Sequence, residues 1–395
     1  MSAGRRRRRP RRPSLPAPVA RLLPLLRRLP LAILVLASIA LAPLSLQRPD
    51  EAGSAGETWT FVSIPDFLNN DVDYPDPLWD EALDYVLDQV KAENPDFVLV
   101  PGDLIDGHWW DGPEDVRENA ERFYTAWTSR MEDKGLEYYA VVGDHEVGDN
   151  DWDEAKQRLV PTFKEEFANR LGMPRNGPPG EEGLAWSVEH KNLTLLAVDV
   201  FEQDASGTVT QAVSGTQLAW VRDTLAASTS THTVVTGHVP VLPTDVRRAS
   251  SGLTLAGGAG APLWTVIAEG GASLYLAGEM HDISSAQKDG VLQVVHGSQP
   301  GAVEEFNYLV AKVSNEGIDL ELKRIATEIE GLGDDVAEDE ISDGVRGPPG
   351  PVTIPDAVRA AGPETIGTAR VGTSPAEGGI RDETGLFRER LSRIS

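Results

Sequence analysis

Acidic residues and histidines recur at one kind of position in this 395-residue sequence, directly after an apolar run that ends in Pro or Gly. Five such runs are followed by Asp66, Asp103, Asp144, His238 and Glu279. More residues of the same types stand close behind, namely Asp106, His145, Glu146 and His281. Carboxylates and imidazoles are common ligands of divalent metal ions. The repetition therefore predicts a metal site.

The apolar runs themselves are typical of buried strands. Phe97–Val100 has no polar alternation, which indicates a strand covered on both faces. In open α/β sheets, ligands collect at the carboxyl ends of the strands. One acidic turn after one strand is common and carries no function by itself. Several such strand ends in one chain favour a shared site.

Helix patterns alternate with the strand patterns between Trp59 and about Ile325. Asp76 and Pro77 predict a helix start, and Asn94-Pro95 predicts its end. Other helices are expected over residues 114–131, 152–171 and 214–225, a hairpin over 184–200, and strands over 291–295, 308–313 and 318–322. Alternating units followed by paired strands predict an α/β fold of two packed mixed sheets flanked by helices.

The two ends of the chain are expected to lie outside this fold, which leaves residues 51–330 as the domain. Residues 1–28 contain ten Arg and no acid, and residues 29–46 are mostly apolar. This order predicts an exported protein, either secreted or periplasmic after cleavage near Ala40 or tethered to the membrane by a retained signal-anchor. Residues 331–395 are rich in acids, Gly and Pro and are predicted to be a disordered tail.

Charge and cysteine content limit the partners and the means of stabilisation. Residues 1–50 hold 11 of the 36 Lys and Arg but one of the 62 acids, so the remainder carries a formal net charge of −36. A surface this acidic repels nucleic acid, so no nucleic-acid partner is expected for the domain. The excess of acids is also typical of adaptation to high salt. With no Cys, the chain has no disulfide to stabilise it.

The spaced motifs resemble those of the calcineurin-like metallophosphoesterases. That family's usual order is Asp-x-His, Gly-Asp-x-x-Asp, Gly-Asn-His-Asp/Glu, a lone His, and Gly-His-x-His. The likeness covers about residues 58–325. Gly102-Asp103-Leu-Ile-Asp106 matches fully, Gly143-Asp144-His145-Glu146 has Asp for Asn, and Gly237-His238 matches. Leu68 replaces the His of the first motif, and Glu279 replaces the first His of the last motif.

The resemblance implies a four-layer αββα sandwich that holds two divalent ions bridged by Asp103. One ion would bind Asp66, Asp103 and His281. The other would bind Asp103, Asp144, His238 and Glu279. By the same likeness, His145 would protonate the leaving group or stabilise the phosphoryl charge, and Glu146 would orient its ring.

The departures from the family pattern change the expected metal chemistry. Losing the imidazole at Leu68 and gaining carboxylates at Asp144 and Glu279 favours Mn²⁺ or Mg²⁺, with Ca²⁺, Zn²⁺ and Fe as alternatives. Asp106 is a candidate for the lost ligand. The adjacent residues Asn69, Asn70 and Asp71 are alternatives to it.

The sequence therefore predicts a metal-dependent phosphoesterase acting on a small-molecule or other phosphorylated substrate, a monoester or a diester. The alternative is a degenerate member of the fold that binds metal or a partner without turnover. Two other histidines have open roles. His108, beside Trp109 and Trp110, is a candidate for a substrate wall or for packing, and His296 is a candidate pocket residue or a structural one.

Overall fold

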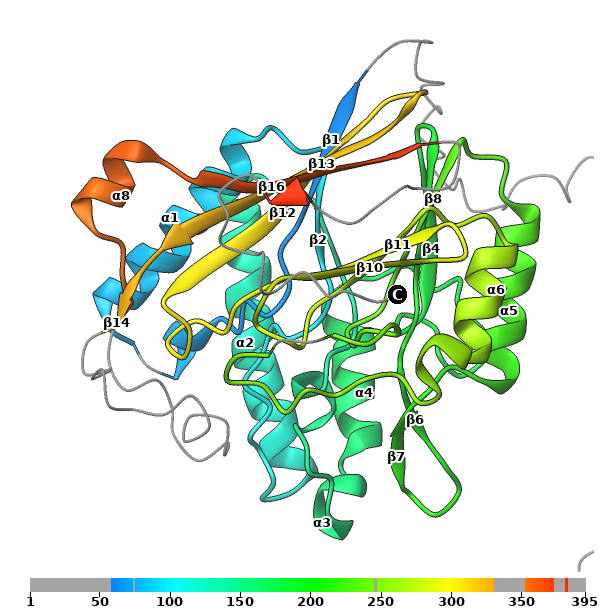
Figure 1. Cartoon of the computed structure of the whole chain (residues 1–395). Coiled ribbons are helices and arrows are strands. Elements are labelled where there is room, and N and C mark those ends of the chain that lie inside the picture. Colours follow the sequence, from blue (N-terminus) through cyan, green and yellow to red (C-terminus); the bar gives the residue numbers. More distant parts are fainter. Residues whose placement is uncertain (1–57, 74, 245–246, 330–351, 373–380, 383–395) are drawn as a thin grey trace, which may run out of the picture. The chain divides into compact units, whose positions relative to one another are not determined.

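A computed structural model describes residues 58–73, 75–244, 247–329, 352–372 and 381–382 (Figure 1). The chain divides into two units, Met1–Asp50 and Glu51–Ser395, and every described residue belongs to the second unit. Within that unit, two large sheets share one hydrophobic core. The predicted α/β class with two mixed sheets and flanking helices is confirmed.

The first sheet has seven strands in the order β17-β16-β13-β12-β1-β2-β3. They are β1 (Trp59–Ser63), β2 (Phe97–Val100), β3 (Tyr138–Ala140), β12 (Glu305–Val313), β13 (Gly317–Ala326), β16 (Glu364–Gly372) and β17 (Arg381–Asp382). β1 is parallel to β2 and antiparallel to β12, with Phe61 opposite Phe97 and Ala311. The sheet thus joins strands from both ends of the described chain.

The second sheet has six strands in the order β10-β11-β9-β8-β5-β4. They are β4 (Trp186–His190), β5 (Leu193–Ala197), β8 (His232–Thr236), β9 (Leu274–Ala277), β10 (Ser284–Lys288) and β11 (Val291–Val295). The predicted hairpin is present as β4 and β5, and β5, β8, β9 and β11 run parallel to one another. Two small sheets pair β6 (Phe201–Gln203) with β7 (Val209–Gln211) and β14 (Glu328–Ile329) with β15 (Val352–Thr353).

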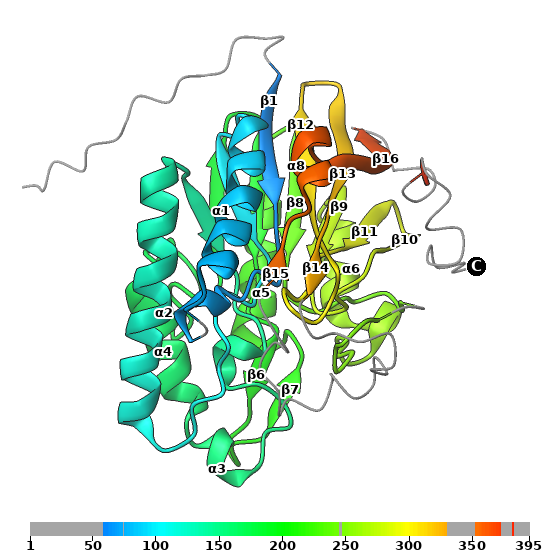
Figure 2. The ribbon, with the colours of Figure 1, turned by 90° about the vertical axis from the view of Figure 1, so that its left-hand side faces the viewer.

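Helices flank the two sheets. α1 (Pro77–Ala92) and α2 (Pro113–Lys134) lie on one side of the first sheet (Figure 2), and α5 (Gly215–Ala227) and α6 (Pro262–Glu269) lie on the right-hand side of Figure 1. α4 (Val160–Arg170) packs beside α2 (Figure 2). The shorter helices are α3 (Glu154–Gln157), α8 (Asp356–Ala361) and the 3₁₀ turns η1 (Asn70–Val72), η2 (His145–Val147) and η3 (Gly258–Gly260).

Local sequence explains where these helices start. The side chain of Asp76 accepts a hydrogen bond from the backbone N–H of Leu78, and Pro77 occupies the first turn, as predicted. The helix expected over residues 152–171 is instead divided into α3 and α4. Pro161 lacks a backbone N–H, so it suits the first turn of a new helix better than the interior of a long one.

The prediction of a disordered tail over residues 331–395 is wrong for residues 352–372. There, β15 pairs with β14, α8 follows, and β16 pairs with β13 along most of its length. Ile366 and Val371 of β16 are fully buried. The strand was missed because Gly, Ala and Thr give it little apolar periodicity, and its stability comes from the edge of β13. Residues 331–351, 373–380 and 383–395 lie outside the described residues.

The predicted membrane tether at residues 29–46 also lies outside the described residues. Among the residues that the structure describes, no helix has the length and apolar character needed to cross a bilayer.

Candidate metal centre

The residues with metal-ligating side chains lie where five strands end. Asp66, Asp103 and Asp144 follow β1, β2 and β3 of the first sheet. His238 follows β8 of the second sheet, and Glu279 and His281 follow β9. These five strands are parallel within their sheets, so their carboxyl ends bring residues far apart in sequence to one place.

Two groups of ligand-type side chains form there, and they share one residue. The first group is Asp66, Asp103 and His281, and the second is Asp103, Asp144 and His238. Within each group, one potential ligand atom per residue lies within 4.8 Å of the others, and all five residues are buried. Asp103 therefore stands between two places where a cation would fit.

The backbone at the centre is held in uncommon conformations. Asp66, Asp103, Glu279 and His281 all have positive φ angles, between 50° and 72°. Such conformations cost energy for residues with a Cβ and gather at functional sites. Glycine also makes room for the ligands, because a Cβ at Gly297 would collide with Oδ2 of Asp66 and one at Gly102 with Nδ1 of His238.

Each histidine is oriented by one ring nitrogen. Nδ1 of His238 lies 2.7 Å from the carbonyl oxygen of Pro101, and Nδ1 of His281 lies 2.8 Å from that of Ala249. Because a carbonyl oxygen only accepts, each Nδ1 carries a hydrogen and donates a hydrogen bond to that oxygen. Nε2 of each ring then faces the centre. Fixing the tautomer in this way is the usual support for a metal-ligating histidine.

Three carboxylates surround Nε2 of His238. Oδ1 of Asp144 is 3.0 Å away, Oδ2 of Asp103 3.3 Å, and Oε2 of Glu279 3.5 Å. The other Glu279 oxygen, Oε1, accepts hydrogen bonds from the side chains of Ser250 and Ser251 and from the backbone N–H of Leu253. Glu279 thus adds one oxygen to the second group, beside Nε2 of His238, and uses its other oxygen to hold a loop.

The donor set fits divalent cations. Oδ2 of Asp66 is buried and has no hydrogen-bond partner among the described residues. Burial, with the nearby charge of Asp103, raises the pKa of Asp66 well above its ordinary value, although His238 opposes this effect. Burial, with the charge of Asp144, raises the pKa of Glu279 to about 7. Four carboxylates are buried here beside only two imidazoles, so the cluster has an excess of acidic groups that bound cations would offset.

His281 is also suited to binding a cation. Burial lowers its pKa to about 4, so its ring is neutral at physiological pH and has a free lone pair on Nε2. Neutral imidazole is the form that coordinates metal.

The sequence matches a family model for calcineurin-like phosphoesterases over residues 78–282, about half of the chain. The chain belongs to this family. Asp66 precedes the matched range, whereas Asp103, Asp144, His238 and His281 lie inside it. No match is found among curated proteins.

Among solved structures, PhoD supports the fold, and two others superpose less closely. PhoD superposes with a TM-score of 0.51 at 10% identity, over 84% of this chain and 72% of that one. GAP50, the anchor in the inner membrane complex of Plasmodium, gives 0.43 at 12% identity over 86% and 98% of the two chains. A putative 5'-nucleotidase from Staphylococcus aureus gives 0.42 at 12% identity over 72% and 57%.

His145 lies beside the candidate metal centre, but Glu146 does not orient it. Nδ1 of His145 is 2.5 Å from the carbonyl oxygen of Asp106, and Nε2 is 3.9 Å from Oδ2 of Asp103. The buried carboxylate of Glu146 instead accepts hydrogen bonds from the backbone N–H groups of Gly143, Asp103, Leu104 and Ile105. Glu146 therefore holds the turn that carries Asp103.

Asp106 does not join the two groups, contrary to the proposal that it replaces the ligand lost at Leu68. It forms a separate group with His108 and His145, in which Oδ2 of Asp106 is 3.3 Å from Nδ1 of His108. Asp149 lies 2.7 Å from the other ring nitrogen of His108. Although burial opposes the effect, these hydrogen bonds raise the pKa of His108 to about 9. His108 is thus a bridging imidazolium.

The alternative ligands next to Leu68 are also occupied elsewhere. Leu68 is fully buried. Oδ1 of Asn69 and both oxygens of Asp71 accept hydrogen bonds from Arg130, which is itself mostly buried. Nδ2 of Asn70 lies 3.5 Å from the carbonyl oxygen of Pro300, and its buried Oδ1 has no hydrogen-bond partner in the part of the chain that the structure describes. Neither Asn69 nor Asp71 is placed to complete the first group.

The remaining candidate, His296, is a structural residue. It is fully buried, its Nε2 lies 3.0 Å from the hydroxyl of Ser63, and burial lowers its pKa to about 3. Trp109 packs against Phe123 and Phe163, whereas Trp110 is exposed, with the ammonium group of Lys156 4.0 Å above its ring.

Sequence reasoning missed the polar residues that support the ligands. Asn150 donates hydrogen bonds to Oδ2 of Asp144 and to the hydroxyl of Ser251, at 3.1 Å and 2.8 Å. Ser250 and Ser251 belong to the segment between β8 and η3, for which the sequence predicts no helix or strand. Single Asn and Ser residues in loops leave no periodic pattern, so nothing else in the sequence points to them.

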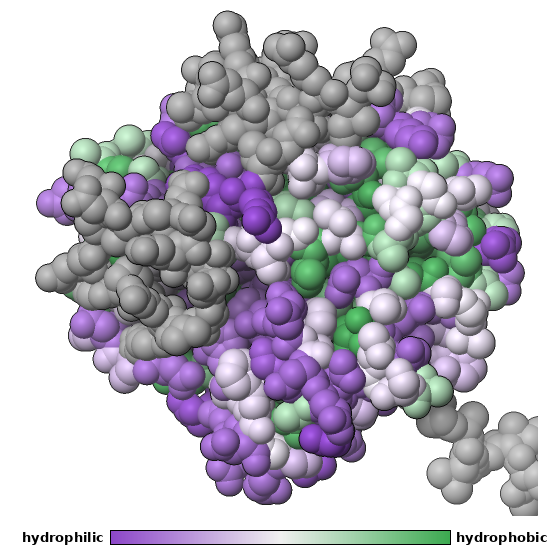
Figure 3. Space-filling view, turned by 60° about the horizontal axis from the view of Figure 1, so that its bottom comes forward, coloured by the Kyte–Doolittle hydropathy of each residue, from purple (hydrophilic) through white to green (hydrophobic). Residues whose placement is uncertain are grey.

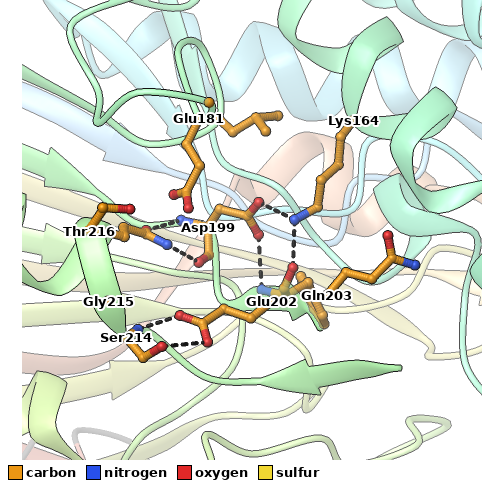
Figure 4. Close-up of a pocket in the computed structure, with 12 residues that line it drawn as sticks. Lys164, Glu181, Asp199, Glu202, Gln203, Ser214, Gly215 and Thr216 are labelled. Carbon is orange, nitrogen blue, oxygen red and sulfur yellow. Dashed lines mark hydrogen bonds and ion pairs between the residues drawn. The ribbon is translucent and has the colours of Figure 1, made fainter. Parts of the chain in front are cut away.

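A separate pocket of about 320 Å³ lies between β6 and the start of α5 (Figure 4). Lys164 pairs with Asp199 there, and Glu202 accepts hydrogen bonds from Ser214. Glu181 also lines the pocket, and burial, with the charge of Asp199, raises its pKa to about 7. None of the predicted site residues lines this pocket, so it is distinct from the metal centre.

The strand ends that carry the ligands point toward the lower side of Figure 1, which Figure 3 brings forward. The described residues on this face are largely hydrophilic, and hydrophobic residues gather in smaller patches (Figure 3).

Proposed function

We propose that the chain is a metal-dependent phosphoesterase that hydrolyses a phosphomonoester or phosphodiester at two divalent ions. The observation that carries the proposal is the sharing of Asp103 between two groups of buried ligands. Asp66 and His281 would complete the site on one side. Asp144, His238 and Glu279 would complete it on the other.

The bound ions would supply a Lewis acid and would activate the attacking water. The oxygen-rich donor set favours Mn²⁺ or Mg²⁺ over softer metals. Everything else in the site concerns the position of the chain's own groups. Glu146 fixes the peptide that carries Asp103, and the carbonyl groups of Pro101 and Ala249 fix the two ligating rings.

His145 is the group best placed to transfer a proton. Because its Nδ1 donates to the carbonyl oxygen of Asp106, the transferable proton lies on Nε2, the nitrogen that faces Asp103. Although burial opposes protonation, the charges of Asp103, Asp149 and Asp144 raise the pKa of His145 well above its ordinary value. A protonated ring at this position would serve as the general acid for a leaving alkoxide.

The deciding experiment measures metal content and turnover on the full chain, purified in high salt. Metal per chain would be determined by elemental analysis, and hydrolysis followed with an aryl phosphate monoester and a diester under added Mn²⁺. Asp103→Asn is expected to lose both metal and turnover, because both groups need this carboxylate. Asp223→Asn changes an exposed residue of α5 and serves as the matched control.

About two metal ions per chain, with turnover that a chelator abolishes, would support the proposal. Metal without turnover of either ester would favour the alternative, a member of the fold that binds metal but has lost its chemistry. Retained activity in Asp103→Asn would contradict the bridging role.

A further inference from the structure

A chain of hydrogen bonds joins two carboxylates of the second group outside their contact with His238. Nδ2 of Asn150 donates to Oδ2 of Asp144 at 3.1 Å and to Oγ of Ser251 at 2.8 Å. Oγ of Ser251 in turn donates to Oε1 of Glu279 at 3.1 Å. Nδ2 of Asn150 also lies 3.5 Å from Oδ1 of Asp149, but its two shorter contacts are those to Asp144 and Ser251. The amide has two hydrogens and the hydroxyl has one, which is enough for the three bonds that join the carboxylates.

The two joined carboxylates are the two that depart from the family pattern. Asp144 stands where Asn is usual, and Glu279 stands where His is usual. Both are almost completely buried, and their charges repel each other, which contributes to the raised pKa of Glu279. A donor chain that ends on both carboxylates offsets this repulsion and fixes the distance between them.

The loop that carries Ser251 also reaches the first group. The carbonyl groups of Arg248 and Ala249 accept from Nδ1 of His281 at 3.0 Å and 2.8 Å. Ser250 and Leu253 add two more donors to Oε1 of Glu279, at 2.9 Å and 2.8 Å. Residues 248–253 therefore contact one ligand of the first group and support two of the second.

We propose that Ser251 and Asn150 are positioning residues that link Glu279 to Asp144 and so set the spacing of the second group of metal ligands. The inference rests on the proposed function, since it concerns the same ions. Asn150 is partly exposed and Ser251 is exposed, whereas the carboxylates they join are buried. The link is thus the outermost polar layer on this side of the centre.

The chain offers a matched control in the neighbouring serine. Ser250 and Ser251 donate to the same oxygen of Glu279, but only Ser251 accepts from Asn150, whereas Ser250 accepts from the backbone N–H of Gly252. Ser250→Ala and Ser251→Ala each remove one donor from Oε1, and only Ser251→Ala breaks the link to Asp144. Ser251→Thr keeps a hydroxyl and is expected to restore it.

The test is titration of the metal-free full chain with Mn²⁺ by isothermal calorimetry, without substrate. Loss of an outer-shell partner typically weakens metal binding about 10- to 100-fold. We expect Ser251→Ala to weaken one of the two Mn²⁺ sites by about that factor, and Ser250→Ala to have a clearly smaller effect. Because Asn150 and Ser251 act through one link, the double variant Asn150→Ala/Ser251→Ala should cost little more than either single variant.

Equal effects of Ser250→Ala and Ser251→Ala, or additive effects of the two positions in the link, would overturn the inference. The inference would also be overturned if the wild-type protein binds two Mn²⁺ ions and Ser251→Ala binds both with unchanged affinity. A wild-type protein that binds no Mn²⁺ would instead overturn the proposed function, and the inference with it.

Discussion

At position 279, a glutamate stands where the family pattern has a histidine. His238 and His281 each direct one nitrogen to the centre and anchor the other on a carbonyl group. Glu279 has the same division of labour, with Oε2 toward His238 and Oε1 on the 250–253 loop. The substitution therefore keeps a ligand that is anchored at its far end and changes the charge by one unit. An anchored carboxylate of this kind is what an intact centre would need at position 279.

His145 gives a prediction that separates catalysis from metal binding. His145→Ala removes the proposed proton donor but none of the residues in the two shared groups. Turnover of an alkyl phosphate should fall by about 10²- to 10⁴-fold, the usual contribution of general acid catalysis. Metal content, measured on the same sample, should stay at the wild-type level. Loss of both would show that the ring is needed to build the centre.

Glu181 gives a prediction about pH and stability. Its folded-state pKa of about 7 lies above the ordinary 4.5, so the native state binds the proton more tightly than the unfolded chain. Stability from this residue is complete below about pH 4.5 and is lost as the pH rises through 7. Glu181→Gln should therefore unfold at a higher temperature than wild type at pH 8 and at a similar temperature at pH 4.5. The exposed neighbour Glu182→Gln is the control, and an equal shift there would contradict the assignment.

At the scale of elements, the sequence predicts what is local or periodic. The strand ends that carry Asp66, Asp103 and Asp144 could be found because an apolar run followed by Gly or Pro is visible in a single sequence. The role of Glu146 could not be found in this way, because its partners at residues 103–105 lie some forty positions away along the chain. β16 was not predicted for a related reason. Its partner β13 is separated from it along the chain by a segment with few apolar residues.

The stability of β16 can be tested directly. Ile366 lies in this strand and is fully buried, so Ile366→Ala should lower the free energy of unfolding by about 2–5 kcal/mol in chemical denaturation. Glu364→Gln, at the exposed start of the same strand, removes a surface ion pair with Arg324 and should cost less than about 1 kcal/mol. No change in Ile366→Ala would mean that β16 is not part of the cooperative fold.

At the scale of the whole molecule, charge sets the conditions under which the fold is stable. Residues 51–395 have a formal net charge of −36, the balance of 25 basic and 61 acidic residues. Repulsion among these charges destabilises the compact state, and salt shortens its reach from about 10 Å at 0.1 M to about 3 Å at 1 M. The unfolding temperature should rise between 0.05 M and 1 M NaCl with Mn²⁺ held constant. A neutral osmolyte at equal osmolality should reproduce only part of the rise, and a fall in NaCl would contradict this account.

β1 lies in the middle of its sheet, so its position affects when the sheet and the candidate metal centre can form during synthesis. Trp59 of β1 pairs with Val313 of β12, and a chain grows at about 5–20 residues per second. The ribosome therefore needs roughly ten to fifty seconds after making the first strand to make its antiparallel neighbour. The interval between the synthesis of Asp66 and that of His281 is almost as long. Asp66, Asp103 and Asp144 are therefore synthesised well before His238, Glu279 and His281, the other residues of the candidate centre.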